Sequence, residues 1–179
     1  WSVFETMELV PGQAVGPHLV RLEESCRVGG VPGFDDALLR SEVETLLQKI
    51  GERAYVRVTL TASGTRLITA EPCPPHRWHE PVRCARGPHN DDPFLPGFVK
   101  HGSRMGWELQ LARLGVDDVL RVSDGRFTEG TRSGVFAVVD GVVWTHPHDG
   151  RILPSTTVNR LLEHAARLGI PVRREGPVS

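Results

Sequence analysis

Lysine and cysteine are both scarce in this sequence. Among 21 basic residues, only Lys49 and Lys100 are lysines. The cysteines, Cys26, Cys73 and Cys84, form an odd and widely spaced set, which argues against a scaffold held together by disulfides. Sparse cysteines are typical of a reducing compartment, so we expect a cytoplasmic protein.

The sequence also lacks an excess of charge of either sign, and it lacks a long apolar run. Its 21 basic and 22 acidic residues give a formal net charge of −1, which provides no electrostatic basis for binding nucleic acid or an anionic membrane. No apolar run approaches the roughly 18 residues that a membrane-spanning helix requires. We therefore expect neither a nucleic-acid partner nor a membrane partner.

The pattern of apolar residues predicts a mixed α/β chain of 179 residues with ample apolar content for a core. Apolar residues at helical spacing, with capping residues at the ends, predict helices over 16–30, 35–51, 105–115 and 155–169. Alternating runs predict strands over 2–9, 55–61, 66–71 and 170–175, and two Asp-Gly hairpins within 119–130 and 135–147.

One cluster of possible metal ligands, in "CPPHRWHEPVRC", resembles a zinc site. Cys73, His76, His79 and Cys84 provide four suitable side chains, but their spacing matches no standard finger and two prolines stiffen the run. We therefore expect no metal site. A zinc-stapled interaction domain is kept as an alternative.

Four separate features suit one cofactor, pyridoxal 5′-phosphate (PLP), although each alone has an ordinary structural explanation. Lys100, in "PGFVKHGSRMG", lies among apolar residues, and an amine can form a Schiff base whereas a guanidinium cannot. Glu129, in "RFTEGTRSGVF", could hold the pyridine nitrogen protonated, although a hairpin residue facing water would look the same. Arg21 and the Ser-Thr-Thr start of the helix at 155 could bind a phosphate, although a surface charge and simple capping would also explain them.

The order of these motifs resembles that of the class IV aminotransferases, the fold-type IV PLP enzymes. The matching stretches cover nearly the whole chain and run in family order: "VFETM", "HLVRLEES", "YVRVTLT", "VKHGSR", "DGRFTEGTRSGVFAV", "WTHP...GRILPSTTVNRLLEHA" and "GIPVRREG". The resemblance implies an α+β fold of two domains: a small α/β domain over 1–86, a linker over 87–97, and a larger, strand-rich cofactor-binding domain over 98–179. It also implies a homodimer. We expect the sequence to be a fragment, incomplete at the C-terminus and lacking the N-terminal strand of the family.

The resemblance assigns roles to individual residues. Lys100 would form the Schiff base and move the proton of the substrate, and Glu129 would pair with the pyridine nitrogen. Arg21, the Thr156 backbone and the Thr157 hydroxyl would bind the phosphate. The remaining candidates are Leu153 beneath the ring, and Arg57 and Arg104 as contacts of the substrate.

The sequence departs from the family pattern at three places. Ser133-Gly134 replaces the usual Ser-Asn, Ser155 replaces the usual first glycine of the phosphate loop, and Met105 replaces the tyrosine of branched-chain enzymes. Our leading expectation is a PLP-dependent aminotransferase acting on a small amino acid and a keto acid. The alternatives are 4-amino-4-deoxychorismate lyase, which releases pyruvate and 4-aminobenzoate and whose Lys-x-x-x-Arg pattern Arg104 matches, and a non-catalytic relative.

Overall fold

A computed structural model describes residues 1–13, 15–73, 80–89 and 91–179. The chain divides into two compact units. The first consists of Trp1–His79 and Val99–Ser103, and the second of Glu80–Phe98 and Arg104–Ser179. Each unit is described by itself below. No helix among the described residues is long and apolar enough to cross a membrane.

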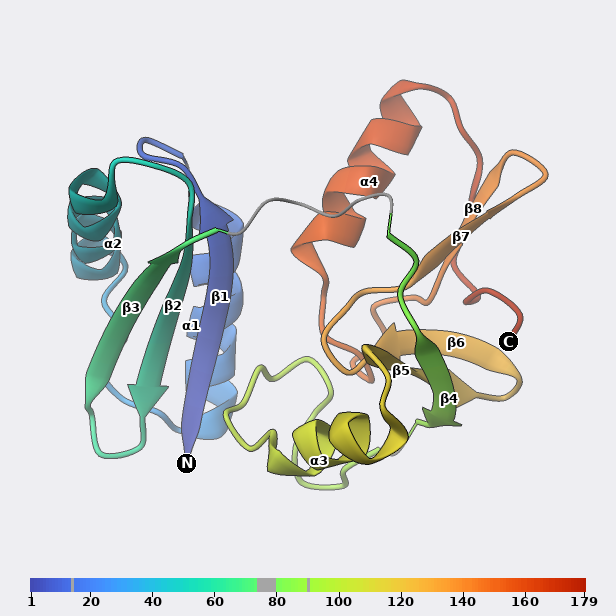
Figure 1. Cartoon of the computed structure of the whole chain (residues 1–179), viewed down its shortest axis with the longest axis horizontal. Coiled ribbons are helices and arrows are strands. Elements are labelled where there is room, and N and C mark those ends of the chain that lie inside the picture. Colours follow the sequence, from blue (N-terminus) through green and yellow to red (C-terminus); the bar gives the residue numbers. More distant parts are fainter. Residues whose placement is uncertain (14, 74–79, 90) are drawn as a thin grey trace. The chain divides into compact units, whose positions relative to one another are not determined.

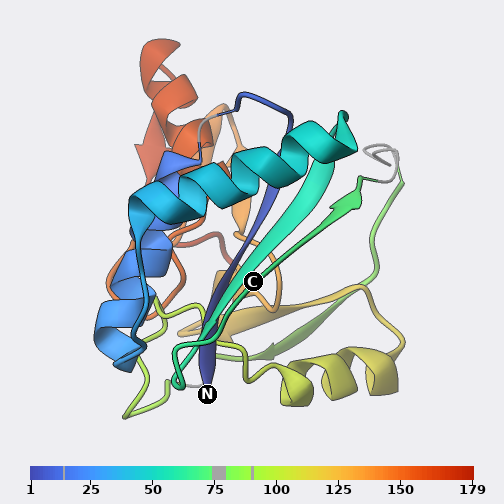
Figure 2. The same cartoon turned by 90° about the vertical axis from the view of Figure 1, so that its left-hand side faces the viewer.

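The first unit is an antiparallel sheet with two helices on one face (Figures 1 and 2). The sheet has the strand order β1 (Ser2–Leu9), β2 (Ala54–Thr61), β3 (Arg66–Pro72). Helix α1 (Gly16–Gly29) packs on β1, and α2 (Asp36–Ile50) packs on β2 and β3. The core lies between the helices and the sheet, and the alternate residues of β1 and β2 are buried in it: Val3, Glu5, Met7, Leu9, Ala54, Val56, Val58 and Leu60.

Local sequence signals account for both helices of this unit. Pro17 occupies the first turn of α1, and Gly30 ends the helix in the left-handed conformation, at φ 61°. The Asp35 side chain caps α2 by accepting a hydrogen bond from the Leu38 N–H at 3.0 Å. Both helices therefore begin and end close to where the sequence predicts.

The second unit contains two small sheets and two helices. One sheet has the order β4 (Cys84–Pro88), β5 (Asp118–Ser123), β6 (Arg126–Gly130), and the other has the order β7 (Phe136–Val139), β8 (Val142–Thr145), β9 (Val172–Arg173). Helix α3 is Met105–Leu114 and α4 is Thr156–Arg167. The apolar face of α4 packs on the second sheet through Val143, Val158, Leu162, Ala165, Ile170 and Val172.

Both predicted Asp-Gly hairpins are present. Asp124 and Asp140 have φ near 50°, and the glycines that follow have φ of 71° and 74°. Positive φ at both central residues is what a two-residue hairpin turn of type I′ requires. The mixed helix-and-sheet fold predicted from the sequence is thus confirmed in its elements.

Two segments differ from their predicted structure. Residues 84–88, part of which falls in the predicted linker, form strand β4 and pair in parallel with β5. The predicted strand over 170–175 is reduced to Val172–Arg173. The compact units also differ from the predicted domain boundaries, because residues 80–98 belong to the second unit and residues 99–103 to the first. The domain assignment of 1–86 and 98–179 stays a prediction.

Candidate functional site

The backbone of Lys100 is fixed on both sides by the first unit. Its carbonyl accepts a hydrogen bond from the Phe4 N–H at 3.0 Å, and its own N–H donates to the Ser25 hydroxyl of α1 at 3.1 Å. A bridge between His101 and Val3 aligns the segment with β1. The half-buried side chain places Nζ 5.4 Å from the centre of the Phe4 ring. The amine is therefore carried by a backbone that has little freedom to move.

Arg57 lies on the same phenyl ring. Its guanidinium carbon is 3.8 Å from the centre of the Phe4 ring, and along β2 Arg57 alternates with the buried Val56 and Val58. Arg57 is exposed, while Phe4 is buried. Two side chains predicted for the site, Lys100 and Arg57, thus meet around one aromatic residue that the sequence analysis did not single out.

Arg21 forms a buried ion pair with Glu5. The carboxylate of Glu5 accepts from Arg21 Nε at 2.6 Å and from Nη2 at 2.7 Å, and His18 Nδ1 lies 3.1 Å from it. Burial alone would raise the pKa of Glu5, but the hydrogen bonds from His18 and Arg21 and the charges of Arg21 and Lys100 together hold it below its ordinary value. Arg21 is therefore held in a fixed orientation by a fully buried carboxylate.

Glu5 was not predicted from the sequence as part of the site, although the alternation of residues along β1 indicates that it is buried. In β1, Val3, Met7 and Leu9 alternate on the buried face, and Glu5 occupies the same register. A carboxylate at a core position requires a cationic partner, because burying an unpaired charge is costly. That reasoning would have directed attention to a cation on the helix that covers β1.

Glu129 and Leu153 are brought together in the second unit. Glu129 Oε2 accepts a hydrogen bond from the Leu153 N–H at 3.1 Å. Burial raises the pKa of Glu129 to about 7, and the Leu153 N–H and the charges of Arg121 and Arg104 only partly oppose that rise. This carboxylate is therefore suited to a cationic or N–H-bearing ligand.

The start of α4 carries the two threonines predicted to bind phosphate. The Ser155 side chain caps the helix by accepting from the Val158 N–H at 3.2 Å. Thr157 is exposed and Thr156 is half-buried, both in the first turn, where backbone N–H groups and the positive end of the helix dipole favour an anion.

Two arginines flank the indole ring of Trp107. The guanidinium carbons of Arg104 and Arg121 lie 4.5 Å and 4.4 Å from the ring centre. Arg104 also donates to the Thr131 carbonyl, and Thr131 is held in turn by Asp118, which accepts from the Thr131 N–H at 2.7 Å. Arg121 was missed by the sequence analysis, although a charged residue inside the apolar run "VLRV" marks it.

The structure describes two of the four candidate zinc ligands. His76 and His79 lie outside the described residues, and of the cysteines Cys84 is exposed and Cys73 is partly exposed. Within the described ranges, no group of three or more His, Cys, Asp or Glu side chains is placed to hold a metal ion.

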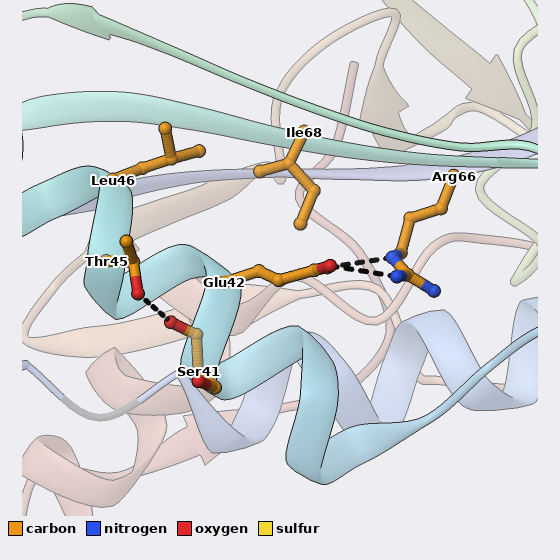
Figure 3. A pocket seen from close by; sticks show the side chains of 6 residues that line it. All are labelled: Ser41, Glu42, Thr45, Leu46, Arg66 and Ile68. Carbon is orange, nitrogen blue, oxygen red and sulfur yellow. Dashed lines mark hydrogen bonds and ion pairs between the residues drawn. The ribbon is translucent and has the colours of Figure 1, made fainter.

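A cavity of about 350 Å³ lies between α2 and β3, away from the predicted site residues of the first unit (Figure 3). It is lined by Ser41, Glu42, Thr45, Leu46, Arg66 and Ile68. Glu42 and Arg66 face each other there and form a bidentate ion pair at 2.7 and 2.8 Å. The two charged side chains among the lining residues therefore neutralise each other.

Solved structures of fold-type IV enzymes resemble the chain over nearly its whole length. A hypothetical aminotransferase from Mycobacterium tuberculosis, solved with α-ketoglutarate and PMP, is 26% identical with a TM-score of 0.83, covering 99% of this chain and 72% of that one. The fold IV transaminase CpuTA1 from Curtobacterium pusillum is 25% identical with a TM-score of 0.85, covering 99% and 70%. A candidate 4-amino-4-deoxychorismate lyase from Legionella pneumophila is 18% identical with a TM-score of 0.83, covering 99% and 74%.

The comparison with curated proteins gave no match. The family model described as amino-transferase class IV matches residues 2–179, which include the segments that carry Lys100, Glu129 and the start of α4. The fold that the sequence predicts, that of the fold-type IV PLP enzymes, is confirmed by the structural matches. The chain belongs to the class IV aminotransferase family of PLP-dependent enzymes.

Proposed function

We propose that the protein is an aminotransferase that uses PLP to act on the amino group of a small amino acid, with Lys100 as its catalytic residue. The observation that carries the proposal is the placement of Lys100. It is one of two lysines in the chain, its backbone is fixed by Phe4 and Ser25, and its amine is half-buried. The other lysine, Lys49, is exposed on α2.

The residues present fit PLP. Glu129 is a half-buried carboxylate whose one hydrogen bond from a described residue comes from Leu153, so it can still accept one from a protonated ring nitrogen. Thr156 and Thr157 begin a 12-residue helix and suit a phosphate. Arg21 would add a cation, oriented by its pair with Glu5, and Leu153 would pack beneath the ring.

Each residue then has a defined task. When bound, PLP supplies an electrophilic carbon and a ring that accepts electrons. Lys100 Nζ would hold the cofactor and, when free, would take up and return the proton of the substrate α-carbon. Glu129 keeps the proton on the ring nitrogen. Arg57 and Arg104 are proposed contacts for substrate carboxylates, and the M. tuberculosis relative solved with α-ketoglutarate makes a keto acid a reasonable second substrate.

The test compares Lys100→Ala with Lys49→Ala. The wild type and Lys49→Ala should bind PLP with a visible absorption band that borohydride abolishes, and Lys100→Ala should lose both the band and turnover. An amino acid should convert the wild type to the pyridoxamine form, and a keto acid should reverse the change. A Lys100→Ala variant that keeps the band and turnover would contradict the proposal.

A second candidate is 4-amino-4-deoxychorismate lyase. The observation that favours it is Arg104, whose half-buried guanidinium lies 4.5 Å from the Trp107 ring centre and could bind a substrate carboxylate. Met105, which is exposed, provides no hydroxyl at the position where branched-chain enzymes carry a tyrosine. Release of pyruvate from aminodeoxychorismate, without formation of the pyridoxamine form, would select the lyase.

A homodimer and a cytoplasmic location are part of the same proposal. The homodimer follows from the family resemblance, and light scattering of the purified protein at several concentrations would test it. The location follows from the sparse cysteines, which are free in this structure, and fractionation of cells that express the protein would test it.

A further inference from the structure

Arg121 is a buried cation without an ion-pair partner among the described residues. Its exposure is 8%, and its Nε has no hydrogen-bond acceptor among the described residues. No salt bridge from Arg121 to a described side chain is present, and its guanidinium contacts the ring of Trp107 instead. A buried guanidinium without an anion is costly, so the position of Arg121 requires an explanation.

Glu129 lies on the adjacent strand, β6. Burial raises the pKa of its carboxyl group, so a nearby cation is needed to favour the ionised form. Strands β5 and β6 are paired, but their register shifts between Leu120 and Val122, so that Arg121 stands opposite two residues, Thr128 and Glu129. The Thr128 hydroxyl also donates to the Arg121 carbonyl at 3.3 Å. Bulges of this kind are common beside active sites, where they redirect a side chain.

We propose that Arg121 is a positioning residue that keeps the Glu129 carboxylate ionised at the cofactor end of the site. The proposal rests on the proposed function, in which Glu129 holds the ring nitrogen. An ionised carboxylate retains the proton on that nitrogen, whereas a neutral carboxylic acid would not. Arg121 therefore acts through Glu129 and touches neither cofactor nor substrate in this assignment.

The charges around Glu129 agree with this role. Burial raises its pKa, Arg121 on β5 and Arg104 before α3 lower it, and Asp118 on β5 raises it. With the pKa already raised to about 7, the loss of a neighbouring cation would raise it further and favour the neutral acid. Arg121 thus favours the ionised form.

The test is an NMR titration of the full chain, labelled with ¹³C at the glutamate carboxyl carbon and free of cofactor. Glu129→Gln assigns the signal. Arg121→Met should raise the Glu129 pKa by about one unit or more, whereas Arg121→Lys should keep it near the wild-type value. The exposed Arg113→Met on α3 is the matched control and should change nothing. An unchanged pKa in Arg121→Met would overturn the proposal.

Two further measurements complete the design. If Arg121→Met fails to fold, the double variant Arg121→Met with Glu129→Gln is the next test. Recovery of folding in the double variant supports the interaction between Arg121 and Glu129. Continued failure assigns Arg121 to packing on Trp107 alone and overturns the proposal. In the PLP-loaded protein, Arg121→Met should move the pH midpoint of the cofactor's visible absorption, and Arg121→Lys should restore it. If the chain binds no PLP, the proposed function fails, but the cofactor-free titration still decides the role of Arg121.

Discussion

At the scale of single residues, Glu5 shows how one buried carboxylate can determine the orientation of the side chains that bond to it. It is completely buried on the helix-covered face of β1 and receives hydrogen bonds from Arg21 and His18. Charge-assisted, bidentate pairs of this kind restrict the guanidinium to one geometry. Arg21 is thus pre-oriented before any phosphate binds.

Glu5→Gln is expected to destabilise the protein by about 3 kcal/mol, because it removes the charge that compensates a mostly buried Arg21. Urea denaturation at pH 7 measures the loss. The matched control is Glu24→Gln, which breaks an exposed pair with Arg27 and should have little effect. Equal effects of the two substitutions would contradict the importance given to the buried pair.

The same variant has a defined pH dependence. The pKa of Glu5 in the folded protein lies below its ordinary value of 4.5, so the stability it contributes is complete above pH 4.5 and is lost as the pH falls through the lowered pKa. Glu5→Gln should therefore remove part of the acid-dependent decline in unfolding free energy. The decline in Glu24→Gln should stay close to that of the wild type.

Candidate residues could be predicted from the sequence where their side-chain chemistry is distinctive. Residues whose importance depends on burial could not be predicted in this way. Lys100 and Glu129 were identifiable because an amine and a carboxylate have few substitutes in PLP chemistry. Arg121 and Glu5 look like ordinary charges until burial is known. The assignments of Lys100, Arg21, Glu129, Leu153, Thr156, Thr157, Arg57 and Arg104 stay predictions that the proposed experiments test.

At the scale of elements, the helices and hairpins were predictable because their signals are local. Asp35, Gly51 and Ser155 cap helices, and the two Asp-Gly pairs form the expected turns. Strand β4 was not predictable in this way, because "CARGP" has no strand pattern of its own and is ordered by pairing with β5, about thirty residues later. The distant partner, rather than local propensity, decides such an element.

Two of the three departures from the family pattern meet in the structure. A Cβ placed on Gly134 would lie 2.6 Å from the Ser155 hydroxyl and 2.8 Å from a methyl carbon of Val158. Real side chains do not approach so closely, so Gly134 leaves the room that the cap of α4 occupies. The glycine and the serine therefore act as one packing unit at the start of the proposed phosphate-binding helix.

Gly134→Ala is accordingly expected to cost about 1–3 kcal/mol of unfolding free energy through overpacking. The cost should be clearly smaller in a Ser155→Gly background, which removes the nearest atoms while costing only a few tenths of a kcal/mol in capping. Gly106→Ala on α3 is the control, since its Cβ would meet nothing within 4 Å. A cost for Gly134→Ala that is the same in both backgrounds would show that the two positions are independent.

At the scale of the whole molecule, the family model matches residues 2–179. The chain spans 70–74% of the length of the three similar solved structures. The sequence does not show that residues 99–103 group with the first compact unit, because that grouping depends on their pairing with β1 rather than on the segment before them.

Ligand-linked stability provides a test that involves the whole chain. A ligand that binds only the folded state stabilises it by about 2.7 kcal/mol at one hundred times its Kd, and this raises the Tm. We expect PLP to raise the Tm of the wild type clearly more than pyridoxal does at the same concentration. The difference isolates the phosphate, because the two compounds share the aldehyde and the ring.

The helix-start residues should account for part of that difference. Thr157→Val removes an exposed hydroxyl in the first turn of α4, so it should leave the Tm of the ligand-free protein nearly unchanged and reduce the advantage of PLP over pyridoxal. Lys100→Ala should reduce the shifts from both compounds, because the aldehyde loses its amine. If Thr157→Val and the wild type showed the same advantage of PLP, the Thr157 hydroxyl would not contact the phosphate, and the role given to it would be wrong even if Lys100 still bound the aldehyde.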